Sequence, residues 1–245
     1  LELIFRYQWS SSNTFGFIKK SKLINTGSKA VKVCLLDGIQ NIMPASIGSD
    51  EQNQSSNLVD AYKRNELEEA TGLGIFALSA ILVDKAEASE ALRANIVWSL
   101  GLENPKHLLS SLQLNDFRLG KSLEQEVDIK AEKGAYFLTT DIFLEKKSSK
   151  EWMLVANVNQ NHSSIAKLSK QIKEDSCLLD KVNDDINLGT KRLVELNSAS
   201  DAIQVSSDNL KDTRHFANTL FNIMRGGIFD NNYQIEKWDF KNYLE

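Results

Sequence analysis

The spacing of apolar residues changes near residue 160, and this change constrains the fold more than any other feature of the sequence. In the first part of the chain, apolar side chains recur at every second position, as in Leu3, Phe5, Tyr7 and Trp9. From Ser164 onward they recur in alternating steps of three and four. The first spacing is typical of β-strands and the second of helices, so the sequence predicts a β-rich part followed by a helical part.

Strand candidates occupy most of the first 160 residues. The alternation over Phe15–Lys20 resumes at Val31–Leu35 after Asn25–Ser28, and we expect a hairpin here because Asn and Gly tolerate the positive φ of a tight turn. Further strand candidates are Gly74–Val83, Ala94–Leu102, Gln125–Ala131, Gly134–Leu144 and Glu151–Asn159. Repeated short strands without long helices between them favour antiparallel sheets packed as a sandwich.

Two segments interrupt the strands with helical patterns. Ser55–Leu67 has an apolar stripe that includes Leu58 and Tyr62, and a serine at its start can accept hydrogen bonds from the first free amides. Pro105–Leu112 is a shorter helix candidate. The sequence therefore predicts an antiparallel β-sandwich domain over residues 1–160, with a short helical insertion near residues 55–67.

The run after Ser164 is the strongest periodic signal in the chain. It is interrupted at Asp175 and Gly189, and its members are Ile165, Leu168, Ile172, Leu179, Val182, Ile186, Leu193 and Leu196. One interpretation is a coiled coil that forms a homodimer. The other is a long helix, or two helices bent near Asn187–Gly189, that packs against the chain's own surface. We favour the second, because Leu178, Leu188 and Val194 make the apolar stripe wider than a two-stranded seam.

A last helix is predicted from about Asp208 to Met224. Asp208 can cap its first amides, and Gly226–Gly227 ends it because glycine adopts the left-handed conformation without a steric penalty. After it, Ile228–Leu244 is rich in aromatic residues and is expected to be extended. Residues 161–245 are therefore predicted as a helical linker region that ends in an extended tail.

Composition excludes several classes of protein. The chain has 245 residues, with 29 basic and 33 acidic side chains and a formal net charge of −4. This mild acidity without a basic cluster argues against a nucleic-acid-binding surface. The longest apolar stretch, Ile75–Val83, is too short to cross a bilayer. The chain starts at Leu1 in the middle of a strand pattern, so we expect it to be a segment of a longer protein, and no cellular compartment is predicted.

The cysteines and histidines do not predict a metal site. Cys34 and Cys177 lie far apart in apolar settings, so we expect free, packed thiols rather than a disulfide. His107, His162 and His215 are too scattered for a zinc site.

Motif searches do not predict a cofactor or a catalytic centre. Gly72–Ala77 has the letters of a dinucleotide-binding G-x-G-x-x-A, but strand-like alternation follows it where a helix is required. Acidic residues cluster at Glu66–Glu69 and again at Glu87 and Glu90, and we interpret both clusters as solvated surface. The sequence has no nucleophile elbow, zinc-protease motif or phosphate-binding loop.

Ligand-binding candidates lie near the end of the last predicted helix. Arg214, His215 and Arg225 could hold a carboxylate, a phosphate or a sugar hydroxyl, since arginine offers a planar fork of donors. Trp238 could stack on a sugar ring. The alternative is structural: an arginine that favours the helix dipole and a histidine that caps a neighbouring segment.

Several phrases of the chain resemble the large, poorly characterised bacterial proteins related to cellobiose phosphorylase. The phrases are Gly16–Ile18, Asn25–Gly27, Leu36–Ala45, Ser89–Asn95 and Arg214–Phe229. In that group a sandwich of the galactose-mutarotase-like type precedes a helical linker and then an α/α barrel that carries the catalytic acid. The resemblance implies a supersandwich-type fold followed by a linker, although the strand region here is short for a complete supersandwich.

The resemblance also implies a function. The chain would be a non-catalytic portion of a glycoside phosphorylase or hydrolase, and its main partner would be the catalytic α/α barrel of the same polypeptide. No catalytic residue is transferred to this sequence, because the acid lies in the barrel. Two alternatives stay open: an independent carbohydrate-binding module that takes an oligosaccharide, and a coiled-coil dimerisation or scaffold protein.

Overall fold

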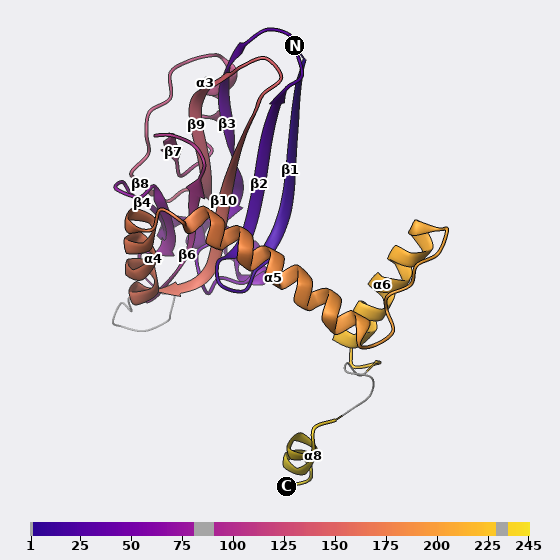
Figure 1. The fold of residues 1–245 in the computed structure, drawn as a ribbon. Coiled ribbons are helices and arrows are strands. Elements are labelled where there is room, and N and C mark those ends of the chain that lie inside the picture. The colour runs from indigo at the N-terminus through magenta and orange to yellow at the C-terminus, as the bar shows by residue number, and fades with distance from the viewer. Residues whose placement is uncertain (1, 81–90, 229–234) are drawn as a thin grey trace, which may run out of the picture. The chain divides into compact units, whose positions relative to one another are not determined.

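The computed structural model describes residues 2–80, 91–228 and 235–245 (Figure 1). In these ranges the chain has a mixed α+β structure with two antiparallel sheets. Sheet A is formed by β1 (Leu3–Ser12), β2 (Gly16–Asn25), β10 (Ser149–Asn161), β6 (Arg93–Leu100), β5 (Leu73–Leu78), β4 (Lys63–Glu68) and β8 (Asp128–Lys130), in this spatial order. Sheet B is formed by β3 (Val31–Ile42), β9 (Gly134–Leu144) and β7 (Lys106–Leu108), also in spatial order.

The helices lie between the strands and after them. The described residues form α1 (Ser49–Gln54), α2 (Ser56–Tyr62), α3 (Leu114–Arg118), α4 (His162–Glu174), α5 (Leu178–Ser198), α6 (Asn209–Met224) and α8 (Lys237–Leu244). The chain divides into two compact units, Leu1–Asn183 and Asp184–Glu245. The first unit holds both sheets, the helices up to α4 and the start of α5. None of the helices in the described ranges combines the length and apolar character that a membrane crossing needs.

The two sheets of the first unit share one hydrophobic core. Sheet A contributes Leu23, Leu67, Phe76, Val97, Trp152 and Leu154, and sheet B contributes Leu35, Tyr136, Leu138, Ile142 and Leu144. Because each strand alternates its side chains between two faces, the sheets bury one face each against the other. The prediction of antiparallel sheets followed by helices is confirmed at this level of detail.

The predicted strand positions are largely confirmed. Gly134–Leu144 is strand β9 with the predicted bounds, and the other candidates coincide with strands whose ends differ by a few residues. The candidate Gly74–Val83 corresponds to β5 and loop residues, and its last three residues lie outside the described ranges.

The hairpin predicted around Asn25–Ser28 is wrong. Strand β2 pairs with β1 and β10 in sheet A, whereas β3 pairs with β9 in sheet B. The turn therefore carries the chain from one sheet to the other. Its conformation is set by Asn25, whose side-chain oxygen accepts from the amide of Gly27 at 3.0 Å. A tight turn in the sequence does not reveal whether the strands on its two sides pair.

The helical insertion predicted near residues 55–67 is shorter than expected. Helix α2 ends at Tyr62, and Lys63–Glu68 is strand β4, paired with β5 and β8. The inward positions of β4 include Lys63 and Asn65, and these polar side chains hide the strand alternation. The buried ammonium of Lys63 donates hydrogen bonds to the side chains of Asp60 and Gln52, both at 2.7 Å.

The short helix predicted over Pro105–Leu112 is also wrong. Residues Lys106–Leu108 form strand β7 at the edge of sheet B, and the neighbouring helix α3 begins only at Leu114. The edge strand is three residues long, which is too short for a two-residue alternation to show in the sequence.

The long helical run breaks at Asp175, and the alternative of a bend near Asn187–Gly189 is wrong. The carboxylate of Asp175 accepts from the amide of Cys177 at 3.1 Å, which ends α4 and turns the chain into α5. Gly189 lies inside α5, because a single glycine costs a helix only about 1 kcal/mol. Leu178 and Val182 are buried in the single chain, as the packing interpretation expects; homodimer formation stays a prediction.

The last predicted helix is confirmed, but the extended tail is wrong in its second part. Helix α6 begins after Asp208, whose carboxylate caps the amides of Leu210 and Lys211, and Gly226 follows it with a φ of 73°. Residues Lys237–Leu244 form helix α8 instead of extended chain. Asp239 in its first turn and Lys241 in its last turn interact favourably with the helix dipole. The many aromatic residues of this segment hide this helical charge pattern in the sequence.

Candidate functional site

A buried ion pair lies between the two sheets. The ammonium of Lys19 on β2 donates to the carboxylate of Asp37 on β3, and both residues are only 8% exposed. Asp37 also accepts from the hydroxyl of Ser21 at 2.9 Å and from the indole nitrogen of Trp152 at 2.8 Å. The charges are thus paired and hydrogen-bonded, as buried charges must be. This arrangement ties sheet A to sheet B and leaves the carboxylate no free oxygen for catalysis.

Beside this pair, the inner face of the β1–β2 edge carries exposed aromatic side chains. Phe5, Tyr7 and Trp9 lie opposite Leu23, Ser21 and Lys19 in the strand register, so they share the face that forms the core. We name Phe5, Tyr7, Trp9 and Phe17 the aromatic face.

The aromatic face is continuous with the core but is not covered by it. The ring of Phe5 stacks on that of Trp152 with centroids 6.0 Å apart, and the ammonium of Lys19 lies 5.6 Å from the centroid of the Tyr7 ring. Tyr7 is nevertheless 62% exposed and Trp9 51% exposed. Sheet B has three strands against seven in sheet A, so it cannot cover the whole inner face. An exposed, contiguous aromatic patch of this kind is typical of an interaction surface.

The four predicted ligand-binding residues lie on two helices of the second unit. Arg214 and His215 are consecutive residues of α6, Arg225 follows its last turn, and Trp238 belongs to α8. The imidazole Nε2 of His215 contacts the backbone oxygen of Asp201 at 3.0 Å, and the Arg225 guanidinium lies 5.2 Å from the ring of Phe221. No hydrogen bond or ion pair in the described ranges joins these four side chains to one another, so their role in binding stays a prediction.

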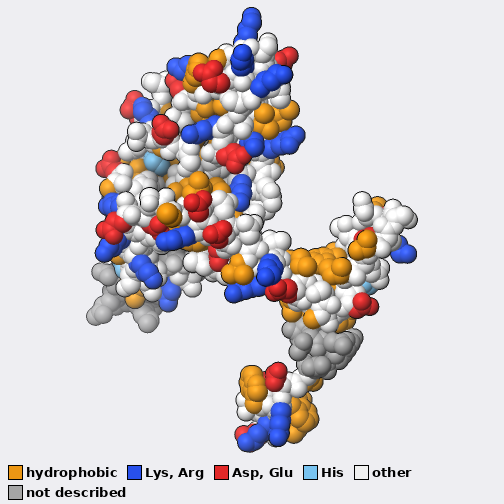
Figure 2. All heavy atoms as spheres, in the orientation of Figure 1, with side chains coloured by type: hydrophobic (Ala, Val, Ile, Leu, Met, Phe, Trp, Pro, Cys, Tyr) orange, Lys and Arg blue, Asp and Glu red, His pale blue; other side chains and the backbone are white. Residues whose placement is uncertain are grey.

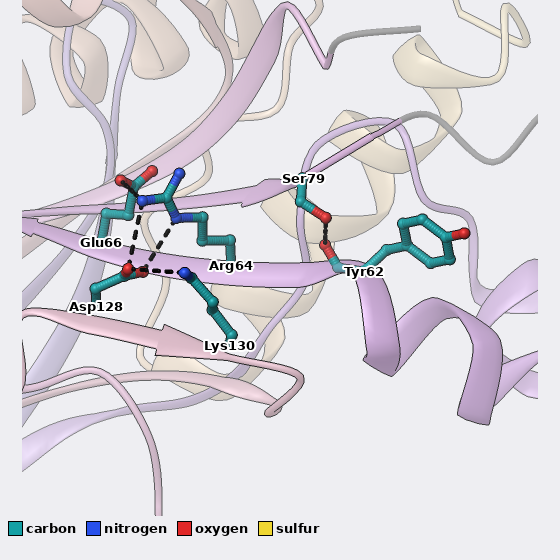
Figure 3. A network of polar contacts seen from close by, with 6 residues as sticks. All are labelled: Tyr62, Arg64, Glu66, Ser79, Asp128 and Lys130. Atoms are coloured by element: carbon teal, nitrogen blue, oxygen red, sulfur yellow. Dashed lines mark hydrogen bonds and ion pairs between the residues drawn. The ribbon is translucent and has the colours of Figure 1, made fainter. Parts of the chain in front are cut away.

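The acidic cluster at Glu66–Glu69 takes part in structural contacts. Figure 3 shows the guanidinium of Arg64 between Glu66 and Asp128, at 2.9 Å and 3.0 Å, with Lys130 3.4 Å from the same aspartate. Arg64 holds the pKa of the Asp128 carboxyl below its usual range, chiefly through their hydrogen bond. These residues join the neighbouring strands β4 and β8 at the edge of sheet A.

Glu68 connects sheet A to helix α4. Its carboxylate accepts from the hydroxyl of Thr71, from the ammonium of Lys173 at 3.2 Å and from Ser169 at 3.4 Å. Burial alone would raise the pKa of Glu68, but the hydrogen bonds from Thr71 and Lys173 outweigh burial and lower it. Glu87 and Glu90, the other predicted acidic cluster, lie outside the described residues.

The remaining reactive side chains are structural or unactivated in this arrangement. His107 is buried against Tyr136, and burial lowers its pKa. Cys34 and Cys177 are free thiols, as predicted, but both are exposed, so the prediction that they are packed is wrong. Partial burial and the nearby Asp141 raise the pKa of Cys34, which disfavours the reactive thiolate. Within the described ranges, no group of three or more histidine, cysteine or acidic side chains could hold a metal ion.

The glycine-rich segment at Gly72–Ala77 comprises the last residue of a hairpin turn, Gly72, and the first part of β5. The turn joins β4 to β5, so a strand follows it, as the sequence indicated. Gly72 has a φ of 70°, and a Cβ there would lie 2.5 Å from Nε2 of His107. The glycine is required by the turn and by the packing of His107.

Comparisons of the whole chain with models of known protein families and with curated proteins give no match.

Proposed function

We propose that this chain is the non-catalytic β-sandwich and helical linker portion of a larger carbohydrate-active enzyme. The sandwich would be of the galactose-mutarotase-like type, and it would support or cap a catalytic α/α barrel of the same polypeptide. The reaction of the whole enzyme would be phosphorolysis or hydrolysis of a glycoside. The observation that carries the proposal is the aromatic face, whose residues occupy core positions of sheet A and are about half exposed.

The physical argument for a covering partner is the cost of exposing aromatic surface. Burying apolar surface contributes about 25 cal/mol per Å², and an aromatic side chain carries roughly 150–250 Å². The aromatic face therefore gains several kcal/mol when another surface covers it. The aromatic face lies on the same face of sheet A as the core and next to it, so it suits a partner surface that extends the sandwich.

The helices of the second unit add a separate argument. Figure 2 shows hydrophobic side chains gathered on α8, and the exposed residues there are Trp238, Phe240, Tyr243 and Leu244. On α6 the exposed apolar residues are Leu210, Phe221 and Met224. Helices with apolar faces of this kind fit a linker that packs against a further domain.

The test is reconstitution from two separately produced pieces. The chain is mixed with the catalytic barrel of its own polypeptide, and complex formation is followed by sedimentation and by Trp fluorescence. We expect a 1:1 complex that Trp9→Ser and Phe17→Ser weaken. Phe143→Ser is the matched control, because Phe143 is also exposed but points to the other face of its sheet. Absence of a complex at micromolar concentrations contradicts the proposal. Turnover of an oligosaccharide by the chain alone, abolished by one carboxylate substitution, also contradicts it.

The alternative function is an independent carbohydrate-binding module. The same aromatic face favours it, because aromatic rings beside a donor such as the exposed Tyr7 hydroxyl can stack on sugar rings. Calorimetry against a panel of oligosaccharides separates the two. Heats that disappear in Trp9→Ser support sugar binding, and flat heats across the panel exclude it.

A further inference from the structure

A depression of the first unit lies on the outer face of sheet A, opposite to the core. It has a volume of about 420 Å³ and is lined by β1, β2, β10 and the first turns of α5. We name it the cationic pocket. Its volume lies in the range of small-molecule sites, which is roughly 300–1,000 Å³.

The strand register places three cations side by side in this pocket. Arg6 lies opposite Lys22, and Lys22 lies opposite Glu151, so these side chains form one row across three strands. Lys20 belongs to the next row, opposite Met153. Like charges that lie opposite each other on a sheet are destabilising unless an anion compensates them.

Among the described residues, only one of the three cations has an anionic partner. The ammonium of Lys22 lies 2.6 Å from the carboxylate of Glu151. Lys20 donates to the amide oxygen of Asn183 on α5 at 2.5 Å, which orients the ammonium but leaves its charge uncompensated. In the part of the chain that the structure describes, Arg6 has no hydrogen-bond or ion-pair partner. The pocket therefore carries a net charge of about +2 on the usual protonation of these side chains.

The remaining lining is suited to a carbon skeleton and to neutral hydrogen bonds. Leu179 of α5 and Met153 of β10 form apolar parts of the wall. Gln8 and Asn183 offer amide groups. A site for a bare ion would need neither this volume nor an apolar wall.

From this geometry we propose that the cationic pocket binds a small phosphorylated molecule, with its phosphate at Arg6 and Lys20 and its carbon part against Leu179 and Met153. A phosphate monoester carries a charge of about −1.5 to −2 at pH 7, which matches the two uncompensated cations. The guanidinium fork of Arg6 fits two phosphate oxygens, and Lys20 supplies a point charge. The site is independent of the proposed function, because it uses neither the aromatic face nor a catalytic barrel.

Titration of the whole chain with glycerol 3-phosphate, glucose 6-phosphate, inorganic phosphate and unphosphorylated glucose tests the proposal by calorimetry. We expect the two phosphate esters to bind at least tenfold more tightly than glucose. Arg6→Gln and Lys20→Gln are each expected to weaken ester binding about tenfold, in line with the loss of one charged hydrogen bond. Inorganic phosphate is expected to bind more weakly than the esters; equal binding would overturn the role of the apolar wall.

The matched control is Lys32→Gln on β3. Lys32 is an exposed lysine in a pair with Asp141, outside the pocket lining, and its substitution is expected to leave ester binding unchanged. The unfolding midpoint of each variant, measured in parallel, separates a binding defect from a folding defect. Absence of ester binding at millimolar concentrations overturns the proposal. So does binding that Arg6→Gln and Lys20→Gln leave unaltered while the fold is intact.

Discussion

At the scale of single residues, the structure distinguishes charges that are required by the fold from charges at its surface. The Lys19–Asp37 pair is nearly excluded from water, and removing one partner of a buried pair costs roughly 3–5 kcal/mol. Asp37→Ala is therefore expected to lower the free energy of unfolding by about 3 kcal/mol, because it leaves the Lys19 ammonium buried without a counter-charge. Urea unfolding followed by circular dichroism measures this loss.

Two further variants make that prediction specific. Lys19→Met combined with Asp37→Leu removes both charges and is expected to recover most of the stability lost in Asp37→Ala. Asp141→Ala breaks the exposed pair with Lys32, whose atoms lie 2.8 Å apart, and is expected to lower the free energy of unfolding far less than Asp37→Ala does, because water screens the exposed charges. Equal losses for Asp37→Ala and Asp141→Ala would show that the inner pair is as solvated as the outer one.

His107 gives the pH dependence of stability a predictable sign. Burial lowers its pKa below the ordinary value of 6.5, so the unfolded chain takes up a proton at this residue before the folded chain does. Stability is then complete above pH 6.5 and falls as the pH is lowered towards the folded-state pKa. His107→Gln is expected to flatten the pH dependence of the free energy of unfolding below pH 6.5.

The ion-paired carboxylate of Asp128 does not obscure this window. The pKa of Asp128 is lowered from 3.8 by Arg64, so its contribution is lost only at more acidic pH. Denaturant titrations at several pH values check the prediction. If the free energy of unfolding depends on pH in the same way in the wild type and in His107→Gln, the proton uptake belongs to another group.

At the scale of secondary-structure elements, the sequence predicts strands whose inward positions are apolar and misses those whose inward positions are polar. Gly134–Leu144 was predicted with its observed bounds, because apolar residues dominate it and a glycine precedes them. Within β4, Lys63–Leu67 falls in the helix that the sequence predicts over Ser55–Leu67, because Lys63 and Asn65 point inward and find polar partners that only the fold supplies. A buried polar side chain whose hydrogen bonds are made by distant residues leaves no recognisable pattern in the local sequence.

The candidate sites were foreseen only in part, for a related reason. The alternation of Phe5, Tyr7 and Trp9 indicated a strand, but their exposure depends on how far sheet B extends, which is a property of long-range pairing. The cationic pocket depends on the register of Arg6 and Lys22 with Glu151, which comes from a strand far from theirs in the sequence. The lysines of Lys19–Lys22 indicate this pocket only weakly in the sequence, because Lys19 points to the core and only Lys20 and Lys22 point to the outer face.

Asn25 joins two connections between the sheets, and its removal is expected to weaken both. Its side-chain nitrogen donates to the backbone oxygens of Lys29 at 2.8 Å and Glu145 at 2.9 Å, which belong to the β2–β3 and β9–β10 connections. Asn25→Ala leaves these oxygens and the amide of Gly27 without this partner, so we expect a loss of about 2–3 kcal/mol at roughly 1 kcal/mol per bond.

Hydrogen exchange locates the effect of this substitution. In Asn25→Ala, amides at the adjoining ends of β3 and β9 are expected to exchange faster, while those of β5 and β6 keep their protection. Gln160→Ala is the control, because its side chain bonds only to the nearby oxygen of Val158 in the described structure. Unchanged exchange at β3 and β9 would mean that the backbone alone holds the two connections.

At the scale of the whole molecule, the first unit combines a dense core with an aromatic face that lies beside this core on the same side of sheet A. Trp152 is 1% exposed in this core and Trp98 is 1% exposed on the other face of sheet A, whereas Trp9 is 51% exposed on the core face. The net charge of −4 counters self-association only weakly over such a surface. The chain by itself is therefore expected to bind a hydrophobic dye and to aggregate on mild heating.

Substitution on the aromatic face is expected to change this behaviour without a comparable change in stability. The double variant Trp9→Ser/Phe17→Ser removes side chains that are already half solvated, so its cost should stay at about 2 kcal/mol, while dye fluorescence falls at least twofold. Trp98→Ser, which empties a fully buried position, should cost roughly 3–5 kcal/mol. In a polypeptide that includes the covering barrel, the same double variant should become several kcal/mol more costly, because the rings are then buried. A cost that is equal with and without the barrel would place its contact elsewhere on the chain.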